Sequence, residues 1–206
     1  KSPELTYLKI EDDGVTFENA EMLAGKNSDE AEKYILAHSN EGAGAMVIGP
    51  AGESQVRFAC IKSDIWRSVG RGGMGAVFGS KNLKGISFLG TKKTEIANPE
   101  LFKKLNKLIA KNGKASPGSL LYRQLGTPMM VNLLNKNKAF PTEYWKSGLF
   151  ENYESINSDY MQEHCEVKAD NCPNCFLRCT KKTKILKGRH EGLSLEGPEY
   201  ETFYAI

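Results

Sequence analysis

The sequence predicts an α+β fold in two parts: a β-rich part over residues 1–95 and the start of a mainly helical part over residues 96–206. Two observations lead to this prediction. Short alternating or apolar runs typical of strands dominate the first part, whereas apolar residues at helical spacing dominate the second. The change of character falls between Gly90 and Asn98.

The first part is expected to open with a β-hairpin. Residues 5–10 alternate and are rich in β-formers, an acidic turn ending in glycine follows, and residues 15–17 resume the pattern. Asn27 is a helix N-cap followed by acidic residues, which predicts a helix over residues 31–38. The glycine-dense segment 70–79 is expected to run into another helix. Short apolar runs predict strands at residues 45–48, 55–61 and 85–89.

The second part is expected to begin with a helix, because Asn98 is a suitable N-cap and Pro99 fits the first helical position. Further helices are predicted over residues 126–137 and 158–164. The basic run at residues 181–189 is interpreted as a solvated loop. The alternative is a docking patch for an acidic electron-transfer partner.

Composition excludes several classes of protein. Lys and Arg number 28 against 25 Asp and Glu, a formal net charge of +3, whereas nucleic-acid-binding proteins cluster more basic charge. No stretch approaches the roughly 18 apolar residues of a membrane span, so neither a nucleic acid nor a membrane is expected as a partner. Five cysteines, three in one tight run, argue against a secreted disulfide framework and favour a reducing, cytoplasmic location. The missing initial Met and the apolar end indicate a piece of a longer chain.

Cys172, Cys175 and Cys179 form a C-x2-C-x3-C run, the most informative feature of the sequence. Three thiolates this close together suit three corners of one metal ion or cluster, and metal ligation is favoured over a set of buried thiols. Iron–sulfur cubes and tetrahedral zinc both require four ligands, so the run is one short. Cys165 lies seven residues before the run, and His190 lies eleven residues after it, outside zinc-finger spacing.

A second motif lies between Trp66 and Ser80 and holds five glycines within residues 70–79. Glycines let the backbone approach a ligand, and open N–H groups bind phosphate oxygens. Arg67 and Arg71 add fork-shaped donors for anions. No hydrophobic strand precedes the glycines, so a Rossmann site is not supported. The spacing leaves cofactor phosphate binding and tight helix packing as equal alternatives.

A third motif crowds three carboxylates, Glu196, Glu199 and Glu201, around a Gly-Pro turn. Spacing alone favours an acidic helix start, because Glu is stabilising near a helix N-terminus. The alternative is that one carboxyl group serves in a pocket as an acid or base.

In their order and spacing, these motifs resemble the aldehyde:ferredoxin oxidoreductase family of tungsten-pterin enzymes. The resemblance covers residues 45–204, whereas residues 1–44 match only in general character. The matching segments are residues 48–53, 67–84, 126–127, the Cys run and residues 196–201.

The resemblance implies tungsten or molybdenum held by two pterins, beside one [4Fe-4S] cluster. It implies that Arg67, Ser68, Val69 and Gly70 line a pterin and that Cys172, Cys175 and Cys179 are cluster ligands. It implies a role in proton transfer for the third motif's Glu201. The implied reaction oxidises an aldehyde to a carboxylic acid with ferredoxin or a similar carrier as electron acceptor, and the parent protein is compatible with a homodimer.

The resemblance also places the fourth cluster cysteine and other pterin contacts outside this sequence. The isolated chain is therefore expected to be free of cofactor and inactive, with an exposed apolar face. One alternative is a family member acting on a hydroxycarboxylate, glyceraldehyde 3-phosphate or an aromatic acyl thioester. Another is a non-enzymatic iron–sulfur or zinc module with Cys165 or His190 as the fourth ligand. A third is a member that has lost its metal and only packs against partners.

Overall fold

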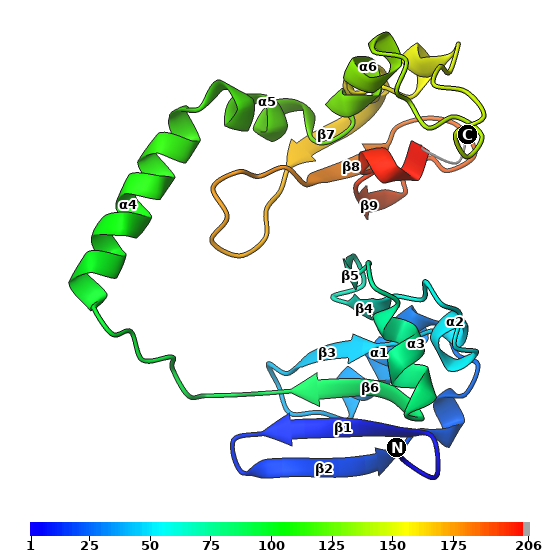
Figure 1. Cartoon of the computed structure of the whole chain (residues 1–206), viewed down its shortest axis with the longest axis vertical. Helices are drawn as coiled ribbons and strands as arrows, with labels where there is room; N and C mark the ends of the chain where they lie inside the picture. Colours follow the sequence, from blue (N-terminus) through cyan, green and yellow to red (C-terminus); the bar gives the residue numbers. More distant parts are fainter. Residues whose placement is uncertain (204–206) are drawn as a thin grey trace. The chain divides into compact units, whose positions relative to one another are not determined.

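The computed structural model describes residues 1–203, except for the side chains of Tyr200 and Glu201 (Figure 1). The chain divides into two compact units, Lys1–Glu95 and Ile96–Ile206. The first contains a six-stranded sheet and the second a three-stranded sheet, each with helices. The α+β class is confirmed, whereas the assignment of the two units to pterin and iron–sulfur binding stays a prediction.

The first unit is built on a mixed sheet in the order β2-β1-β6-β3-β4-β5 (Figure 1). β1 runs parallel to β6, and every other neighbouring pair is antiparallel. β1 and β2 form the predicted hairpin, and β5 is the last strand at the opposite edge. The strands are β1 (Thr6–Glu11), β2 (Gly14–Asn19), β3 (Gly44–Val47), β4 (Ile61–Ser63), β5 (Arg67–Val69) and β6 (Leu83–Phe88).

Helices complete this unit, and α1 begins at its predicted cap. The side chain of Asn27 accepts a hydrogen bond from the N–H of Glu30 at 2.9 Å, and the Glu30 carboxylate accepts one from the N–H of Asn27 at 3.2 Å. This reciprocal capping box satisfies two N–H groups that the helix leaves unpaired. Ile35 of α1 is fully buried in a core with Tyr7 and Val47. The helices are η1 (Glu21–Leu23), α1 (Ser28–Ala37), α2 (Pro50–Glu53) and α3 (Met74–Ser80).

The strand predicted over residues 55–61 is wrong, because turns and irregular backbone follow the short helix α2 and occupy that region up to Ile61. Pro50 takes the first position of α2, where its missing N–H costs nothing. The chain then turns at Gln55, whose φ is 55°, and only Ile61 belongs to a strand. The Gly49-Pro50 pair after β3 therefore begins a helix, which the sequence did not predict.

A buried ion pair ties three segments of the first unit together. Lys84 on β6 has no exposed surface, and its ammonium donates hydrogen bonds to the Glu53 carboxylate and, at 2.8 Å, to the carbonyl of Lys26. The other Glu53 oxygen accepts a hydrogen bond from the N–H of Gly25 at 2.8 Å. A buried ammonium needs partners of this kind, because an unpaired charge in an apolar interior is very costly. The pair therefore fixes the end of α2 against the sheet.

The second unit contains four α-helices and an antiparallel sheet with β8 in the middle. The side chain of Asn98 caps α4 by accepting a hydrogen bond from the N–H of Leu101 at 2.9 Å, as predicted. The helices are α4 (Pro99–Ala115), α5 (Pro117–Leu125), α6 (Met129–Lys136), η2 (Tyr153–Ser155), α7 (Ser158–His164) and η3 (Tyr200–Phe203). The strands are β7 (Cys165–Ala169), β8 (Lys181–Ile185) and β9 (Ser194–Glu196).

The solvated loop predicted over residues 181–189 is wrong in its first half, which forms β8. Lys181 and Thr183 are buried, whereas Lys182 and Lys184 are exposed, the alternation expected of a strand. A lysine-rich run usually indicates a solvent-exposed segment. The sequence therefore does not reveal that Lys181 is buried on one face of a strand. The sequence analysis also missed α5, which precedes the predicted helix now seen as α6.

An exposed apolar face, as expected from the sequence, is present on α4. This helix has no buried residue in the structure. Its apolar side chains that are about half exposed or more are Leu101, Phe102, Leu105, Leu108 and Ile109. In the described part of the chain, no helix combines the length and apolar character needed to cross a membrane.

Lys84→Gln is expected to lower the free energy of unfolding by about 3–5 kcal/mol, because it leaves the Glu53 carboxylate in a largely buried place without its cation. Urea denaturation followed by circular dichroism measures this change. The matched control is Lys33→Gln, which breaks an exposed pair with Asp29 and should cost less than about 1 kcal/mol. Equal losses for the two variants would contradict a special role for the buried pair.

Candidate functional site

The four residues expected to line a pterin form β5 and the position after it. In the described sheet β5 pairs with β4 and is the last strand of the order. Ser68, Val69 and Gly70 are exposed and Arg67 is half-buried. The outer backbone edge of this strand therefore has hydrogen-bonding groups open to a ligand or solvent.

Lys62 adds a cation that the sequence analysis did not identify. It lies directly opposite Ser68 on β4, and its ammonium donates a hydrogen bond to the Ser68 hydroxyl at 2.8 Å. Arg67 lies opposite Ser63, so its side chain is on the other face of the hairpin from Lys62 and Ser68, and each face has one cation. Lys62 could be identified only from the pairing of β4 with β5, and the sequence did not predict where β4 begins.

The turn between β4 and β5 is held by a buried carboxylate from α1. Asp64 and Ile65 both adopt positive φ, at 51° and 59°. The N–H of Ile65 donates a hydrogen bond at 3.0 Å to Glu32, whose side chain is almost fully buried. Positive φ is unfavourable for a β-branched residue such as Ile65, so this bond helps to keep the turn in place. Helix α1 thus positions β5.

The five glycines of the second motif divide into two groups. A Cβ at Gly73, Gly75 or Gly79 would lie 2.0, 2.5 or 1.9 Å from a backbone oxygen of an earlier segment, so these three permit close packing of α3. A Cβ at Gly70 or Gly72 would meet nothing within 4 Å. Tight packing therefore explains the later glycines, and only the first two leave an open backbone for a ligand.

The Cys run lies on the loop between β7 and β8. The N–H of Cys175 donates a hydrogen bond to the carbonyl of Cys172 at 3.0 Å, and the two residues between them are Pro173 and Asn174, the latter with φ of 61°. This is the pattern of a type II turn, which keeps its first and fourth Cα atoms within about 7 Å. All five cysteines are free, with Cys172 exposed and the other two thiols of the run, Cys175 and Cys179, half-buried.

Across the residues whose positions are described, no three His, Cys, Asp or Glu side chains are arranged to hold a metal ion. The three thiols of the run share one loop without converging on a single point. Thiolates are the usual ligands of iron–sulfur clusters, and the turn keeps two of these cysteines close together. The run has three thiolates, however, whereas a cubane cluster needs four.

Neither candidate for a fourth ligand within the chain lies near this loop. The loop joins Ala169 to Lys181, whereas Cys165 pairs with Ile185 at the other end of the β7–β8 ladder, about 13 Å of strand away. His190 lies in the turn beyond Ile185, which the backbone hydrogen bonds between β8 and β9 hold at that same end. The topology therefore separates both residues from the Cys run.

Lys181 anchors the end of the Cys loop from beneath. It is 1% exposed, and its ammonium lies 2.9 to 3.3 Å from the carbonyls of Tyr122, Arg123, Arg178 and Cys179. The first two belong to the last turn of α5, where the Tyr122 carbonyl also accepts a hydrogen bond from the N–H of Gly126 at 2.9 Å. Burial lowers the pKa of Lys181, and nearby Cys179 opposes that shift. One buried cation thus joins α5, β8 and the Cys loop.

The acidic third motif is held to the same framework. The hydroxyl of Thr127 donates a hydrogen bond to the Glu199 carboxylate, and the hydroxyl of Thr183 donates one to the carbonyl of Gly197 at 2.5 Å. The chain then enters η3, in keeping with the predicted helix start. The side chain of Glu201, the residue expected in proton transfer, lies outside the described groups.

Two family models together match nearly all of this chain. The aldehyde ferredoxin oxidoreductase N-terminal domain matches residues 1–90, and aldehyde ferredoxin oxidoreductase domains 2 and 3 match residues 100–206. Both models describe parts of oxidoreductases. The chain belongs to the aldehyde ferredoxin oxidoreductase family.

Curated relatives agree over the full length of the chain. It is 34% identical over 212 residues to a tungsten-containing aldehyde ferredoxin oxidoreductase of Thermococcus kodakarensis and 32% identical to that of Pyrococcus furiosus, covering 100% of this chain and 34% of each relative. It is also 28% identical to the WOR-like subunit of an aliphatic sulfonate oxidoreductase of Pyrococcus furiosus, over 98% of this chain and 34% of that one. The chain spans about a third of the length of these relatives.

A solved structure shares the fold. The active-site complex BamBC of benzoyl coenzyme A reductase, in complex with 1,5-dienoyl-CoA, superimposes with a TM-score of 0.65 and 26% identity. The match covers 90% of this chain and 30% of that chain. It supports the α+β architecture.

Gly79→Ala is expected to lower the free energy of unfolding by about 2 kcal/mol or more, because its Cβ would lie 1.9 Å from the carbonyl oxygen of Gly52. Gly70→Ala, which meets open space, should stay within about 0.5 kcal/mol of the wild type. Thermal unfolding followed by circular dichroism compares the two. A destabilised Gly70→Ala variant, or a neutral Gly79→Ala variant, would contradict the division of the glycines.

Lys181→Met is expected to loosen the Cys loop, because it keeps the side-chain volume and removes the donors shared by four carbonyls. Hydrogen exchange at residues 171–180 should accelerate about tenfold or more. Lys182→Met changes the neighbouring exposed lysine and should leave exchange in the loop unaltered. Unchanged exchange in Lys181→Met would contradict the anchoring role.

Proposed function

We propose that these 206 residues act within a longer tungsten- or molybdenum-pterin oxidoreductase that oxidises an aldehyde to a carboxylic acid and passes the electrons to ferredoxin or a similar carrier. Family membership and the tungsten-containing relatives support this proposal. The observation that carries it is the Cys loop, from which Cys165 and His190 are both separated by the fold. A cluster completed by another part of a longer protein fits this geometry, and a self-contained module does not.

In this proposal the edge strand β5 lines a pterin. Arg67 offers a guanidinium fork, and the backbone at Ser68, Val69 and Gly70 offers hydrogen-bonding groups. The exposed strand edge and the open space at Gly70 support this role. Lys62, bonded to Ser68, adds a cation on the face of the hairpin opposite to Arg67.

Cys172, Cys175 and Cys179 would provide three of the four thiolates of a [4Fe-4S] cluster. When bound, the metal pterin would supply a Lewis acid and an electron sink, and the cluster would supply an exit for single electrons. The chain itself contributes the positioning. The Cys-Pro-Asn-Cys turn keeps the Cα atoms of Cys172 and Cys175 within about 7 Å, and Lys181 binds the carbonyl of Cys179.

The overall reaction consumes one aldehyde and one water and yields one carboxylic acid, two protons and two electrons. We assign one proton-transfer step to the carboxylate of Glu201, because a carboxylate near the reacting carbon can accept a proton in the transition state. The electrons leave one at a time to the carrier protein. The proposed reaction involves neither a nucleic acid nor a membrane.

The substrate is the least constrained part of the proposal. An aldehyde agrees with the family and with four of the relatives. A different substrate is the second candidate, favoured by the similarity to an aliphatic sulfonate oxidoreductase subunit and to the benzoyl coenzyme A reductase complex. The free cysteines agree with a reducing, cytoplasmic location, which we also propose. A homodimer of the parent stays a prediction.

The test is made on the source protein, purified without oxygen. Cys175→Ser should lose most of its iron and its ferredoxin-dependent aldehyde oxidation, because a cubane cluster needs all four thiolates. Cys165→Ser should keep both, since Cys165 lies at the far end of the sheet. Iron analysis and reduction of ferredoxin by acetaldehyde are the two measurements. Loss of metal in Cys165→Ser would instead favour the self-contained module.

A further inference from the structure

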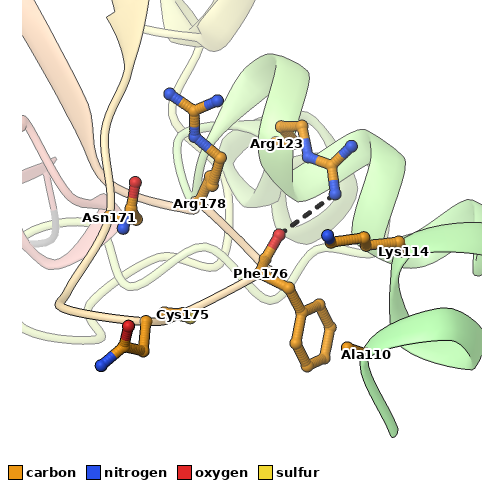
Figure 2. A pocket seen from close by; sticks show the side chains of 8 residues that line it. Ala110, Lys114, Arg123, Asn171, Cys175, Phe176 and Arg178 are labelled. Carbon is orange, nitrogen blue, oxygen red and sulfur yellow. Dashed lines mark hydrogen bonds between the residues drawn. The ribbon is translucent and has the colours of Figure 1, made fainter. Parts of the chain in front are cut away.

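A cationic cavity of about 530 Å³ lies beside the Cys loop, entirely within the second unit (Figure 2). Its walls come from the end of α4, from α5 and from the loop itself. Lys114, Arg123 and Arg178 line it together with Cys175, and none of its eight lining residues is acidic. A concave surface with three cations and no carboxylate is complementary to an anionic group.

Backbone contacts hold this cavity in shape. The ring of Phe176 packs against α4 where a Cβ at Gly113 would lie 2.2 Å from it. The Phe176 carbonyl accepts a hydrogen bond from the Arg123 guanidinium at 3.1 Å (Figure 2), and the Arg178 guanidinium donates to the carbonyl of Ala169 at 2.9 Å. A guanidinium has five N–H donors, so these single bonds orient each arginine and leave further donors for a ligand.

We infer that this cavity receives carboxylate side chains of an acidic electron-carrier protein that docks against the Cys loop. The inference rests on the proposed function, because it takes this loop to be the exit for electrons. A protein fits better than a small ion, since Lys114 and Arg178 are exposed and Cys172 is exposed on the same loop. Electron-transfer encounters use small interfaces, and charge complementarity gives them speed.

The basic run at residues 181–189 fits this partner less well than the cavity does. Lys181 is buried and Lys182 lies 3.4 Å from the Asp170 carboxylate. Lys187 and Arg189 lie in the turn beyond Ile185, at the end of the sheet that is farther from the cysteines. Docking there would place the carrier away from the loop.

The test uses the source protein, purified without oxygen, and a fluorescently labelled two-cluster bacterial ferredoxin as the acidic probe, with binding followed by anisotropy. Lys114→Glu should weaken binding about fivefold or more at about 50 mM salt, and about 300 mM salt should abolish most of the difference. The matched control is Lys187→Glu, an equal change of charge at an exposed site in the turn beyond Ile185, at the end of the sheet farther from the Cys run. It should alter binding less than about twofold. Circular dichroism verifies that both variants keep the wild-type fold.

Equal weakening by the two variants would show attraction by net charge alone and would overturn the inference. So would the absence of salt-dependent binding. Binding of inorganic phosphate that depends on Lys114, in the absence of any binding of ferredoxin, would also overturn the inference. The ligand of the cavity would then be a small anion and not a carrier protein. The anisotropy of the labelled ferredoxin reports binding alone and does not depend on enzyme turnover. A carrier that binds through Lys114, combined with a source protein free of iron, would therefore refute the proposed function and leave the docking surface standing.

Discussion

Burial of a single ammonium, that of Lys181, determines how the Cys loop is held. Its charge is balanced by carbonyl oxygens at the end of α5 and at both sides of Cys179, so helix, strand and loop share one polar centre. Gly126 permits the close approach, because a Cβ there would lie 3.1 Å from the Cys179 carbonyl. The first unit uses the same device, with Lys84 and Glu53 fixing α2 against the sheet. In both units a buried lysine joins segments that are distant in the sequence.

The sequence predicted an element correctly where residues that are close in sequence determine it. The caps at Asn27 and Asn98 mark the starts of α1 and α4, because a side chain bonds to a backbone N–H within the same turn. The prediction failed at β8, where lysine composition indicates solvent and only the tertiary partners of Lys181 explain a strand. It failed also at α2, because a Gly-Pro pair fits both the end of a strand and the start of a helix.

In the candidate site, too, the sequence identified residues that belong to a motif and missed residues whose role depends on contacts between distant segments. The Cys run and the Arg67–Gly70 segment were found by motif and resemblance, and their chemistry depends on residues near in sequence. Lys62 and Arg123 were not found, because their relevance comes from a hairpin register and from packing of α5 beside the loop. The glycines could not be sorted by spacing alone. What a Cβ would meet at Gly70 or Gly79 depends on distant segments.

In the proposed function, the three thiols of the Cys loop bind a cluster together with a part of the longer protein outside these residues. Anaerobic intact-mass and metal analysis of the source protein, beside the 206-residue chain, tests this most directly. The expected result is a longer protein with tungsten or molybdenum and about four irons, and a 206-residue chain without stoichiometric metal. A source protein of only 206 residues carrying one zinc or a cluster of its own would contradict it.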